Sequence, residues 1–405
     1  MTTPHALRWR AGGPAWWLAA AGLGLLLLFP LLLVDVPPVL DYPNHLARIF
    51  VLAHPDDPVL AALYAPRWRV LPNLGIDLVG VALLRVLPVH VAGRILLGVT
   101  LLLPVVGVVA HARAVLGRWS WWSLAAGLVA SNGAFLLGMM NYVWSAGAAL
   151  LAAALFVALR PRHPVAAAAG CALAGVAVFF CHIIGVGFLA VLIGAQEAMR
   201  SHRLRRDGRP WRRSAAASLL CVGTALLPAV LLYGVSPFGL AQAPPAWTPL
   251  AAKPRELLLP FLSYSVRVTL LSAAGVAFIL GRSLARRRCQ LDGGTALACL
   301  ALLGLWLAAP FALKGGTFLD ARLTLLPGLL LFAGFAPRLA PREARTVTAV
   351  VLALLLLRVG TMAQAWAGHG AELAALRRAI APVQPGERVL AVLAEPERMP
   401  DGPGD

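Results

Sequence analysis

The chain has 405 residues, of which 60% are hydrophobic and 13% are charged, and its mean hydropathy is +0.79. A soluble domain of this size cannot bury so much apolar surface, so the composition excludes a soluble globular protein. The net charge of +18 would suggest nucleic-acid binding in a soluble chain. Here the arginines gather in short stretches between apolar runs, which is typical of cytoplasmic loops and argues against a nucleic-acid partner.

Apolar runs long enough to form membrane-spanning helices recur along the chain. The first run follows Arg8 and Arg10 and has no small-residue cleavage site before Asp35, so we predict an uncleaved signal anchor. Twelve apolar segments are predicted in chain order: 15–34, 73–87, 91–110, 119–137, 142–159, 164–180, 183–199, 214–233, 266–280, 294–310, 323–335 and 346–360.

Arginine-rich stretches decide the predicted topology. They lie between the later apolar segments at 200–213, 282–288 and 338–345. If all twelve segments crossed, the first stretch would lie outside, against the cytoplasmic bias of arginine. One earlier segment must therefore fail to cross. We expect it within 119–159, where polar and small residues around Asn132 and Asn141 interrupt the run and favour a broken or re-entrant element.

The sequence thus predicts an all-α polytopic membrane protein with about eleven transmembrane helices and a cytoplasmic N-terminus. Residues 1–360 would form the transmembrane domain, and residues 361–405 a short extracytoplasmic tail. Within that tail, 371–380 is predicted to be an amphipathic helix and 388–393 an extended segment. The outer face would also carry the loops 35–72, 236–264 and 311–322.

The densest polar cluster of the first outer loop is Asp41-Tyr42-Pro43-Asn44-His45-Leu46-Ala47-Arg48. Asp41 can cap a helix, Pro43 suits its first turn, and the apolar residues that follow recur at helical spacing. We therefore predict an interfacial helix. Asp41 and His45 would lie near its start and are candidate catalytic residues; the alternative is a helix cap and an interfacial histidine.

Asp77 enters an apolar segment close to its outer end. A carboxylate at membrane depth is functional or paired by default. Asp77 is therefore a candidate substrate-binding residue, and the alternative is a structural pairing with Arg267, Arg322 or a helix end. Asn141, in the interrupted stretch, is a further candidate for substrate binding.

Two later positions complete the set of candidate binding residues. His182 lies at the outer junction of two predicted spans, where it serves either as a ligand or as a hydrogen-bonded core residue. Lys314, Asp320 and Arg322 cluster before the segment 323–335, on the outer side and against the positive-inside trend, so a negative group is expected to hold the two cations there. Arginine is suited to bidentate recognition of phosphate; salt bridges to Asp320 or Asp77 are the alternative.

These features resemble the GT-C class of integral-membrane glycosyltransferases, which use polyprenyl-phosphate sugars as donors. The resemblance rests on the signal-anchor helix, on Asp41 in Asp-Tyr-Pro-Asn-His beside an interfacial helix, and on Arg322 in Asp-Ala-Arg-Leu-Thr-Leu-Leu-Pro. Many members carry two adjacent acids in the first loop, whereas Tyr42 follows Asp41 here. The metal is therefore unknown, no cofactor is assigned, and a divalent cation is left open.

The resemblance implies a sugar transfer at the extracytoplasmic face, with a lipid-linked sugar donor and membrane lipids as partners. Asp41 would be the base, Arg322 with Lys314 and His182 would hold the phosphate, and His45 and Asp77 would orient acceptor or sugar. The composition suggests a bacterial inner membrane. A transporter or lipid flippase and a non-catalytic membrane scaffold are the alternatives, although polar residues gather at one face and no internal repeat is visible.

Overall fold

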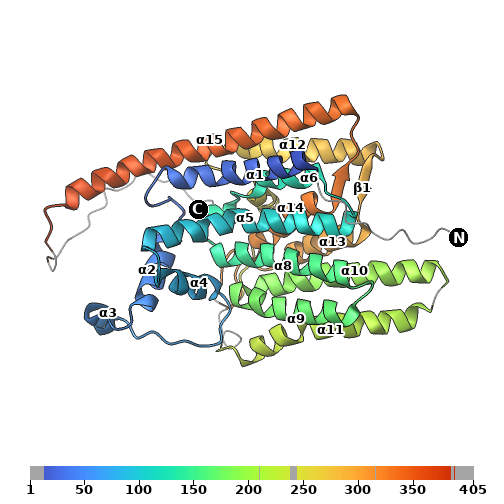
Figure 1. Ribbon diagram of the computed structural model, residues 1–405, viewed down its shortest axis with the longest axis horizontal. Coiled ribbons are helices and arrows are strands. Elements are labelled where there is room, and N and C mark those ends of the chain that lie inside the picture. Colours follow the sequence, from blue (N-terminus) through green and yellow to red (C-terminus); the bar gives the residue numbers. More distant parts are fainter. Residues whose placement is uncertain (1–12, 209, 238–243, 315, 385–386, 388–405) are drawn as a thin grey trace.

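The protein is a bundle of helices of very different lengths, as seen in a computed structural model (Figure 1). The structure describes residues 13–208, 210–237, 244–314, 316–384 and 387. Its first half contains α1 (Pro14–Leu28), the 3₁₀ helix η1 (Phe29–Leu32), α2 (Tyr42–Ala53), α3 (Pro58–Leu63), α4 (Gly75–Leu84), α5 (Val89–Leu116), α6 (Trp121–Leu124), η2 (Ala125–Val129), α7 (Gly133–Leu136), α8 (Met140–Leu159) and α9 (Pro164–Cys181). The second half contains α10 (Ile183–Arg206), α11 (Trp211–Val235), η4 (Lys253–Phe261), α12 (Val266–Ala285), β1 (Cys289–Leu291), α13 (Gly293–Ala308), α14 (Leu319–Ala333), β2 (Phe335–Pro337) and α15 (Pro341–Ile380).

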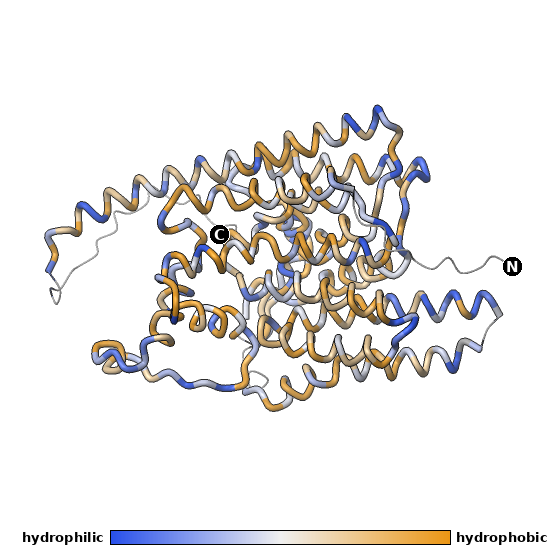
Figure 2. Tube along the Cα trace, viewed as in Figure 1, coloured by the Kyte–Doolittle hydropathy of each residue, from blue (hydrophilic) through white to orange (hydrophobic). Residues whose placement is uncertain are grey.

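The all-α membrane architecture predicted from the sequence is confirmed. Eight helices of the described chain are long and apolar enough to cross a bilayer. Two short strands, β1 and β2, pair antiparallel with Gln290 opposite Ala336 and join the ends of neighbouring helices. Hydrophobic residues fill the middle of the bundle and polar residues gather toward its two ends (Figure 2). The molecule is therefore a multi-pass membrane protein.

Along its described residues, the chain passes from one end of the bundle to the other eleven times. The eight long helices account for eight passes, and α13, α14 and the broken segment formed by α6, η2 and α7 add three. At one end of the broken segment, Trp119 packs against Trp16 at the start of α1, with 4.6 Å between ring centroids. Near the other end, the carbonyl of Leu136 accepts a hydrogen bond from the backbone of Leu40, which follows α1 and η1. The broken segment thus passes from one end of the bundle to the other.

The prediction that the non-crossing element lies within 119–159 is wrong. The segment that fails to cross is 73–87, because α4 has ten residues and reaches only about 15 Å, half the thickness of the hydrocarbon core. Both α4 and α2 lie at the left end of the bundle in Figure 1 and pack against each other. The predicted number of passes holds, but a different segment stays at the surface.

Broken backbone at membrane depth is tolerated here because its polar groups find partners. The side chain of Asn132 accepts a hydrogen bond from the backbone of Phe135 and donates to the carbonyls of Val129 and Ala130. Arg358 of α15 donates to the carbonyl of Ser131 at 2.9 Å. The polar residues that suggested a re-entrant element are therefore the ones that allow this stretch to cross.

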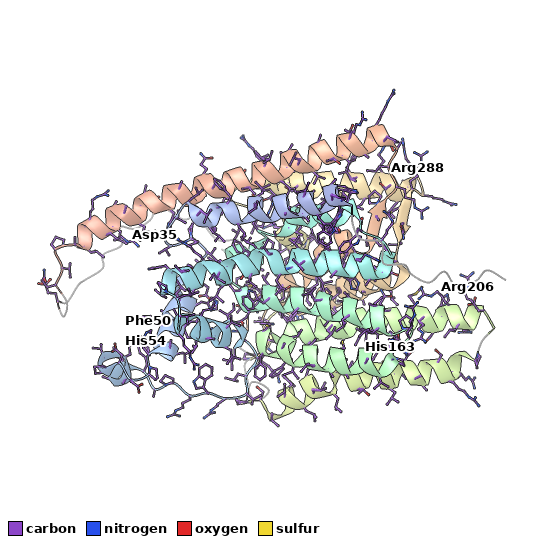
Figure 3. All side chains as sticks on the ribbon, viewed as in Figure 1. Asp35, Phe50, His54, His163, Arg206 and Arg288 are labelled. Atoms are coloured by element: carbon purple, nitrogen blue, oxygen red, sulfur yellow. The ribbon has the colours of Figure 1, made fainter. Side chains whose placement is uncertain are left out.

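The arginine-rich stretches lie together at one end of the bundle. Arg206 and Arg288 both appear at the right of Figure 3, where α15 also begins, whereas Asp35 and His54 lie toward the left. This arrangement agrees with an odd number of passes between the start of α1 and the end of α15. The positive-inside tendency predicts that the arginine-rich end faces the cytoplasm. The opposite end, which we call the outer end, carries α2, α3 and α4.

The centre of the bundle is built from α5, α8 and the broken segment. Gly107 of α5 and Gly147 of α8 face each other so closely that a side chain on either would meet the backbone of the other helix. Small residues allow this close approach between membrane helices. The start of α8 is thereby fixed against α5, and α8 carries Asn141 and Tyr142 to the outer end.

The last pass is a single helix, α15, of 40 residues. The predicted span 346–360 and the predicted amphipathic helix 371–380 are parts of it, so the expected boundary at residue 360 lies inside a continuous helix. At about 60 Å, α15 is roughly twice as long as the hydrocarbon core is thick, and its last turns project beyond the bundle (Figure 1). The predicted extended segment 388–393 lies outside the described residues.

Candidate functional site

The outer end of the bundle carries the interfacial helix expected from the sequence, α2. Its buried stripe consists of Tyr42, His45, Leu46 and Ile49, at the spacing of one helical face. Asp41 occupies the N-cap position but makes no side-chain cap. Its carboxylate accepts instead from the side-chain amide of Asn44 at 2.9 Å and is 53% exposed. Asp41 is therefore an open carboxylate at the outer surface.

The end of the broken segment lies directly against Asp41. Gly138 has a positive φ of 78°, and a Cβ at this position would stand 2.6 Å from the backbone nitrogen of Asp41. Only glycine suits both the conformation and the approach. The carbonyl of Gly138 lies 3.0 Å from Nε2 of His45, and Asp41 Oδ2 lies 3.7 Å from the same atom. The break in the third pass thus helps to orient the first-loop residues.

His45 has a defined tautomer in this arrangement. Because the carbonyl of Gly138 can only accept, Nε2 carries the hydrogen and donates to it. Nδ1 then carries the lone pair and accepts from Nη2 of Arg48 at 3.3 Å. Burial, followed by the nearby Arg48 guanidinium, lowers the pKa of His45 below its usual value. His45 is therefore neutral and fully hydrogen-bonded, and it orients its neighbours rather than taking up a proton.

Asp77 completes this group, which we call the α2–α4 network (Asp41, His45, Arg48 and Asp77). Its carboxylate is 2% exposed and accepts from Nε of Arg48 at 2.9 Å. The expected alternative of a structural pairing is thus realised, but the partner is Arg48 and neither Arg267 nor Arg322. The side chain of Arg48 remains 44% exposed and is linked to Asp41 through His45, which contacts both.

Asn141 fixes the start of α4. Its side-chain oxygen accepts from the backbone of Ile76 at 2.9 Å, and its amide donates to the carbonyl of Asn73 at 3.0 Å. The backbone of Leu74 also donates to the carbonyl of Phe180 at the end of α9. Asn141 is thereby fully used in holding α4, and through it Asp77, in place.

His182 and Arg322 meet at the outer junction of α9, α10 and α14. The backbone N–H of Ile184 donates to Nδ1 of His182, so the hydrogen of the neutral ring is on Nε2. Nη1 of Arg322 lies 3.3 Å from that same Nε2. Two hydrogen-bond donors therefore face each other, because a neutral imidazole can accept at only one nitrogen.

The surroundings of Arg322 leave its charge unpaired by any carboxylate of the described residues. Its Nε is buried and has no hydrogen-bond partner. The phenol of Tyr142 donates to the backbone carbonyl of Arg322, and the Tyr142 ring lies edge-on to His182 with 5.6 Å between centroids. An anionic oxygen between Arg322 and His182 would accept from both and remove the donor-to-donor contact.

The short segment Gly138–Tyr142 connects the two groups. Gly138 contacts Asp41 and His45, Asn141 holds the start of α4, and Tyr142 contacts Arg322 and His182. Five consecutive residues therefore bring together Asp41, His45, Asp77, His182 and Arg322, which lie far apart in the sequence. Both groups therefore lie against one short segment of the chain at the outer end.

Lys314 lies beside a cavity at the same end. Its ammonium donates to the phenol oxygen of Tyr233 at 3.3 Å. Tyr233 lines a cavity of about 650 Å³, together with Arg69, Val70, Gly234, Val235, Ser236 and Pro237. Arg69 precedes α4 and Tyr233 ends α11, so two cations from separate parts of the chain lie on or next to one open space.

Asp320 belongs to a different group. Its carboxylate is fully buried and accepts from Nζ of Lys253 at 3.1 Å and from the hydroxyl of Thr248 at 2.7 Å. Lys253 also donates to the carbonyls of Trp306 and Ala309. The interaction binds η4 to the ends of α13 and α14 and leaves Asp320 no free oxygen face for a substrate.

A divalent cation was left open by the sequence. The described residues contain no group of three or more histidine, cysteine, aspartate or glutamate side chains positioned to hold a metal ion. Asp77, the acid on the helix packed against α2, is already occupied by the Arg48 guanidinium. The proposed reaction is therefore assigned to side chains alone, and the question of a divalent cation stays open.

The chain resembles a known protein in its fold. No family model matches the chain, and no curated protein matches it. Among solved structures, it is similar to ArnT from Cupriavidus metallidurans bound to undecaprenyl phosphate, with a TM-score of 0.52 and 16% identity over 85% of this chain. The chain spans 65% of the length of that ArnT. The GT-C-like fold suggested by the sequence motifs is confirmed.

Sequence reasoning missed three basic residues: Arg48, Lys253 and Arg358. Arg48 was part of the quoted polar cluster, and its position one helical turn after His45 could have signalled their contact. Lys253 and Arg358 have partners far away in the sequence, so no local pattern reveals them. Arg358 could have been noticed as a charge inside the predicted span 346–360.

Proposed function

We propose that the chain is a membrane glycosyltransferase that moves a sugar from a polyprenyl-phosphate donor to an acceptor hydroxyl at the outer face of a bacterial inner membrane. One observation carries the proposal: the segment Gly138–Tyr142 holds an open carboxylate and an unpaired arginine at the same end of the bundle. The similarity to a fold that binds undecaprenyl phosphate in ArnT supports the choice of donor.

Asp41 acts as the base in this proposal. The acceptor oxygen forms a bond to the anomeric carbon of the sugar, and its proton passes to the Asp41 carboxylate. The bond between that carbon and the phosphate oxygen breaks, and polyprenyl phosphate leaves with the electron pair. Asp41 suits this role because it is half exposed and has a hydrogen-bonding neighbour in Asn44 that fixes one oxygen.

Arg322 and His182 stabilise the leaving phosphate. A phosphate oxygen between Nη1 of Arg322 and Nε2–H of His182 would accept two hydrogen bonds, one of them from a cation. The buried Nε of Arg322, which has no protein partner, offers a further donor. Lys314 and Arg69, at the cavity beside Tyr233, add positive charge on the path of an anionic lipid headgroup.

The remaining residues position this machinery. His45 contacts Asp41 and, together with Asp77, holds Arg48, while Asn141 fixes α4, which carries Asp77. Asp320 acts at a greater distance, by anchoring the start of α14 to Lys253. A direct substrate contact is thus proposed for Asp41, Arg322, His182 and Lys314, and an indirect role for the other predicted residues.

The transporter reading fits these observations less well. Transporters and flippases place ionisable residues near the middle of the membrane, often between repeated halves. Here the open carboxylate and the unpaired arginine lie at one end, and both terminal nitrogens of the buried Arg358 donate to backbone carbonyls. A non-catalytic scaffold would not require Arg322 to lie against a second hydrogen-bond donor, since this contact becomes favourable only when an anion accepts from both groups.

The test is release of polyprenyl phosphate by the protein in lipid, followed by mass spectrometry over a panel of polyprenyl-phosphate sugars with crude membrane glycan as acceptor. Asp41→Asn is expected to lower the rate by about 100- to 10,000-fold, since it removes the base. Asp56→Asn, in the same loop and exposed, is the matched control and should retain the wild-type rate.

Each outcome is decisive for one part of the proposal. Release that survives Asp41→Asn in a folded variant would keep the enzyme and reject the base. Absence of release from every donor, with movement of the intact donor between leaflets in sealed vesicles, would replace the transferase with a flippase. Equal loss in Asp56→Asn would point to damage of the whole loop.

A further inference from the structure

The arginine-rich end of the bundle contains a cluster that the proposed reaction does not use. The strands β1 and β2 pair with Cys289 opposite Pro337, and the backbone of Arg338 donates to the carbonyl of Arg288 at 2.7 Å. This pairing ties the end of α12 to the start of α15. The side chains of both ends are thereby held at fixed positions relative to each other.

Three arginines of the α12 end converge on one carboxylate. Nη2 of Arg282 lies 3.2 Å, Nη1 of Arg286 3.7 Å and Nη1 of Arg288 3.9 Å from the oxygens of Glu343. The three side chains are 43%, 49% and 58% exposed, so each retains donors that face outward. One carboxylate neutralises only one of the three charges, which leaves a preorganised local excess of positive charge. We call these four residues the Glu343 cluster.

The Glu343 cluster lies at the depth of the lipid headgroups. The 20 residues of α12 span about 30 Å, which equals the thickness of the hydrocarbon core. Arg282 is in its last turn, and Arg286 and Arg288 follow directly. Arg288 is seen at the right end of the bundle in Figure 3. Guanidinium groups at this depth meet phosphate groups of the adjacent leaflet.

We propose that the Glu343 cluster is a binding site for the phosphate headgroup of an anionic phospholipid in the leaflet at the arginine-rich end. Arginine presents a planar fork of donors that matches phosphate oxygens. Glu343 holds the three guanidinium groups together but neutralises only one of their three positive charges. The anionic headgroup balances part of the remaining positive charge. The proposal is independent of the glycosyltransferase assignment, because it concerns the opposite end of the bundle.

A second arginine-rich stretch at the same end provides the matched comparison. The helices α10 and α11 have 24 and 25 residues, or about 36 Å each, so their joined ends project past the hydrocarbon core (Figure 1). Arg203, Arg206 and Arg213 are exposed there. The acid within this stretch, Asp207, is exposed, and the ion pairs of the described residues do not join it to Arg203, Arg206 or Arg213. Glu197, which precedes the stretch on α10, is buried and paired with Arg160 and Arg200. These three arginines therefore carry the same charge as the three arginines of the Glu343 cluster. They are not held together by a shared carboxylate, and they lie beyond the depth of the lipid headgroups.

The experiment measures phosphatidylglycerol bound to the full chain in neutral detergent by native mass spectrometry, with phosphatidylcholine as the zwitterionic reference. Each arginine near a charged surface contributes about 1 kcal/mol, so Arg282→Gln, Arg286→Gln and Arg288→Gln together should weaken phosphatidylglycerol binding by roughly 100-fold. The equally charged triple change Arg203→Gln, Arg206→Gln and Arg213→Gln should weaken it by less than about 5-fold.

A substitution of the opposite sign separates binding from a structural role. Glu343→Gln keeps a hydrogen-bond-accepting oxygen but removes the negative charge, so it should tighten phosphatidylglycerol binding by about 5-fold. Weaker binding in Glu343→Gln, or equal losses in the two triple variants, would overturn the proposal. Displacement of phosphatidylglycerol by millimolar inorganic phosphate would assign the cluster to a soluble anion and would also overturn it.

Discussion

Arg322 and Arg358 both belong to membrane-crossing helices, yet their guanidinium groups have opposite surroundings. Arg358 is 2% exposed and donates to the carbonyls of Phe261, Ser131 and Leu262. Nη1 of Arg322 faces Nε2–H of His182, which cannot accept, whereas the buried Nε has no partner in either arginine. The difference teaches that charge at membrane depth alone does not mark a site. The two arginines differ in their terminal nitrogens, which donate to backbone carbonyls in Arg358 and meet a second donor in Arg322.

The largest expected effect follows from the satisfied arginine. In Arg358→Met, three buried carbonyls lose their donors at the junction of η4 and the broken segment, and each orphaned acceptor costs about 1–3 kcal/mol. After partial relaxation we expect the free energy of unfolding in detergent to fall by about 3–5 kcal/mol, measured by denaturant titration of tryptophan fluorescence.

The matched control lies on the same helix. Arg377 is 51% exposed and pairs only with Asp35 among the carboxylates of the described residues, and an exposed pair is worth at most about 1 kcal/mol. Arg377→Met should therefore unfold close to the wild type. Similar losses in both variants would mean that α15 tolerates no change of charge, and the distinction drawn from the carbonyl contacts would fail.

The unpaired arginine should behave in the opposite way. Arg322→Met is expected to change the free energy of unfolding by less than about 1 kcal/mol, since no acceptor is orphaned. In the same variant, release of polyprenyl phosphate should fall by about 100- to 1,000-fold, because the leaving phosphate loses its cationic donor. The two measurements are made on one preparation.

Arg322→Lys refines this test. Lysine keeps the charge but lacks the planar fork, so a partial rate, about 10-fold below the wild type, is expected if the fork binds phosphate. A variant Arg322→Met that is unstable but retains full release would reverse the assignment, since Arg322 would then be structural.

The contrast also shows what a sequence can reveal. The number of passes followed from the twelve apolar segments together with the positions of the arginines, because parity needs no knowledge of contacts. The identity of the non-crossing segment did not follow, because 73–87 is as apolar as a true span and only its helix, α4, is short. The interruptions around Asn132 suggested a re-entrant element, but hydrogen bonds from Asn132 and from Arg358 satisfy the broken backbone.

The placement of the candidate residues at the outer end could be predicted in part. Asp41, His45, Asp77, Asn141, His182 and Arg322 were selected as polar residues at predicted outer ends, and the structure brings them to one segment. Their roles could not be read from their types. Asp320 and Asp77 differ from Asp41 because Lys253 and Arg48 occupy them, and those partners depend on packing between distant helices.

The smallest effect concerns the contact that most resembles Arg322 with His182, namely Arg48 with His45. Here Nδ1 of the imidazole carries a lone pair, which accepts a hydrogen bond from Nη2 of Arg48. Protonation of His45 would turn this contact into the same donor-to-donor arrangement as at His182. Because burial and Arg48 lower the pKa of His45 in the folded protein, the unfolded chain takes up this proton first as the pH falls below about 6.5.

Stability contributed by neutral His45 should therefore be complete above about pH 7 and decrease below pH 6.5, by at most about 1.4 kcal/mol per pH unit. The measurement compares the unfolding free energies of wild type and His45→Gln between pH 5 and 8. The glutamine can mimic the hydrogen bond to Gly138 but does not titrate. The stability of His45→Gln relative to wild type should therefore increase as the pH falls. His54→Gln, exposed at the end of α2, should follow the wild-type curve in parallel. A difference between wild type and His45→Gln that is constant over this range would mean that His45 is not held neutral by Arg48, and the orienting role assigned to it would be lost.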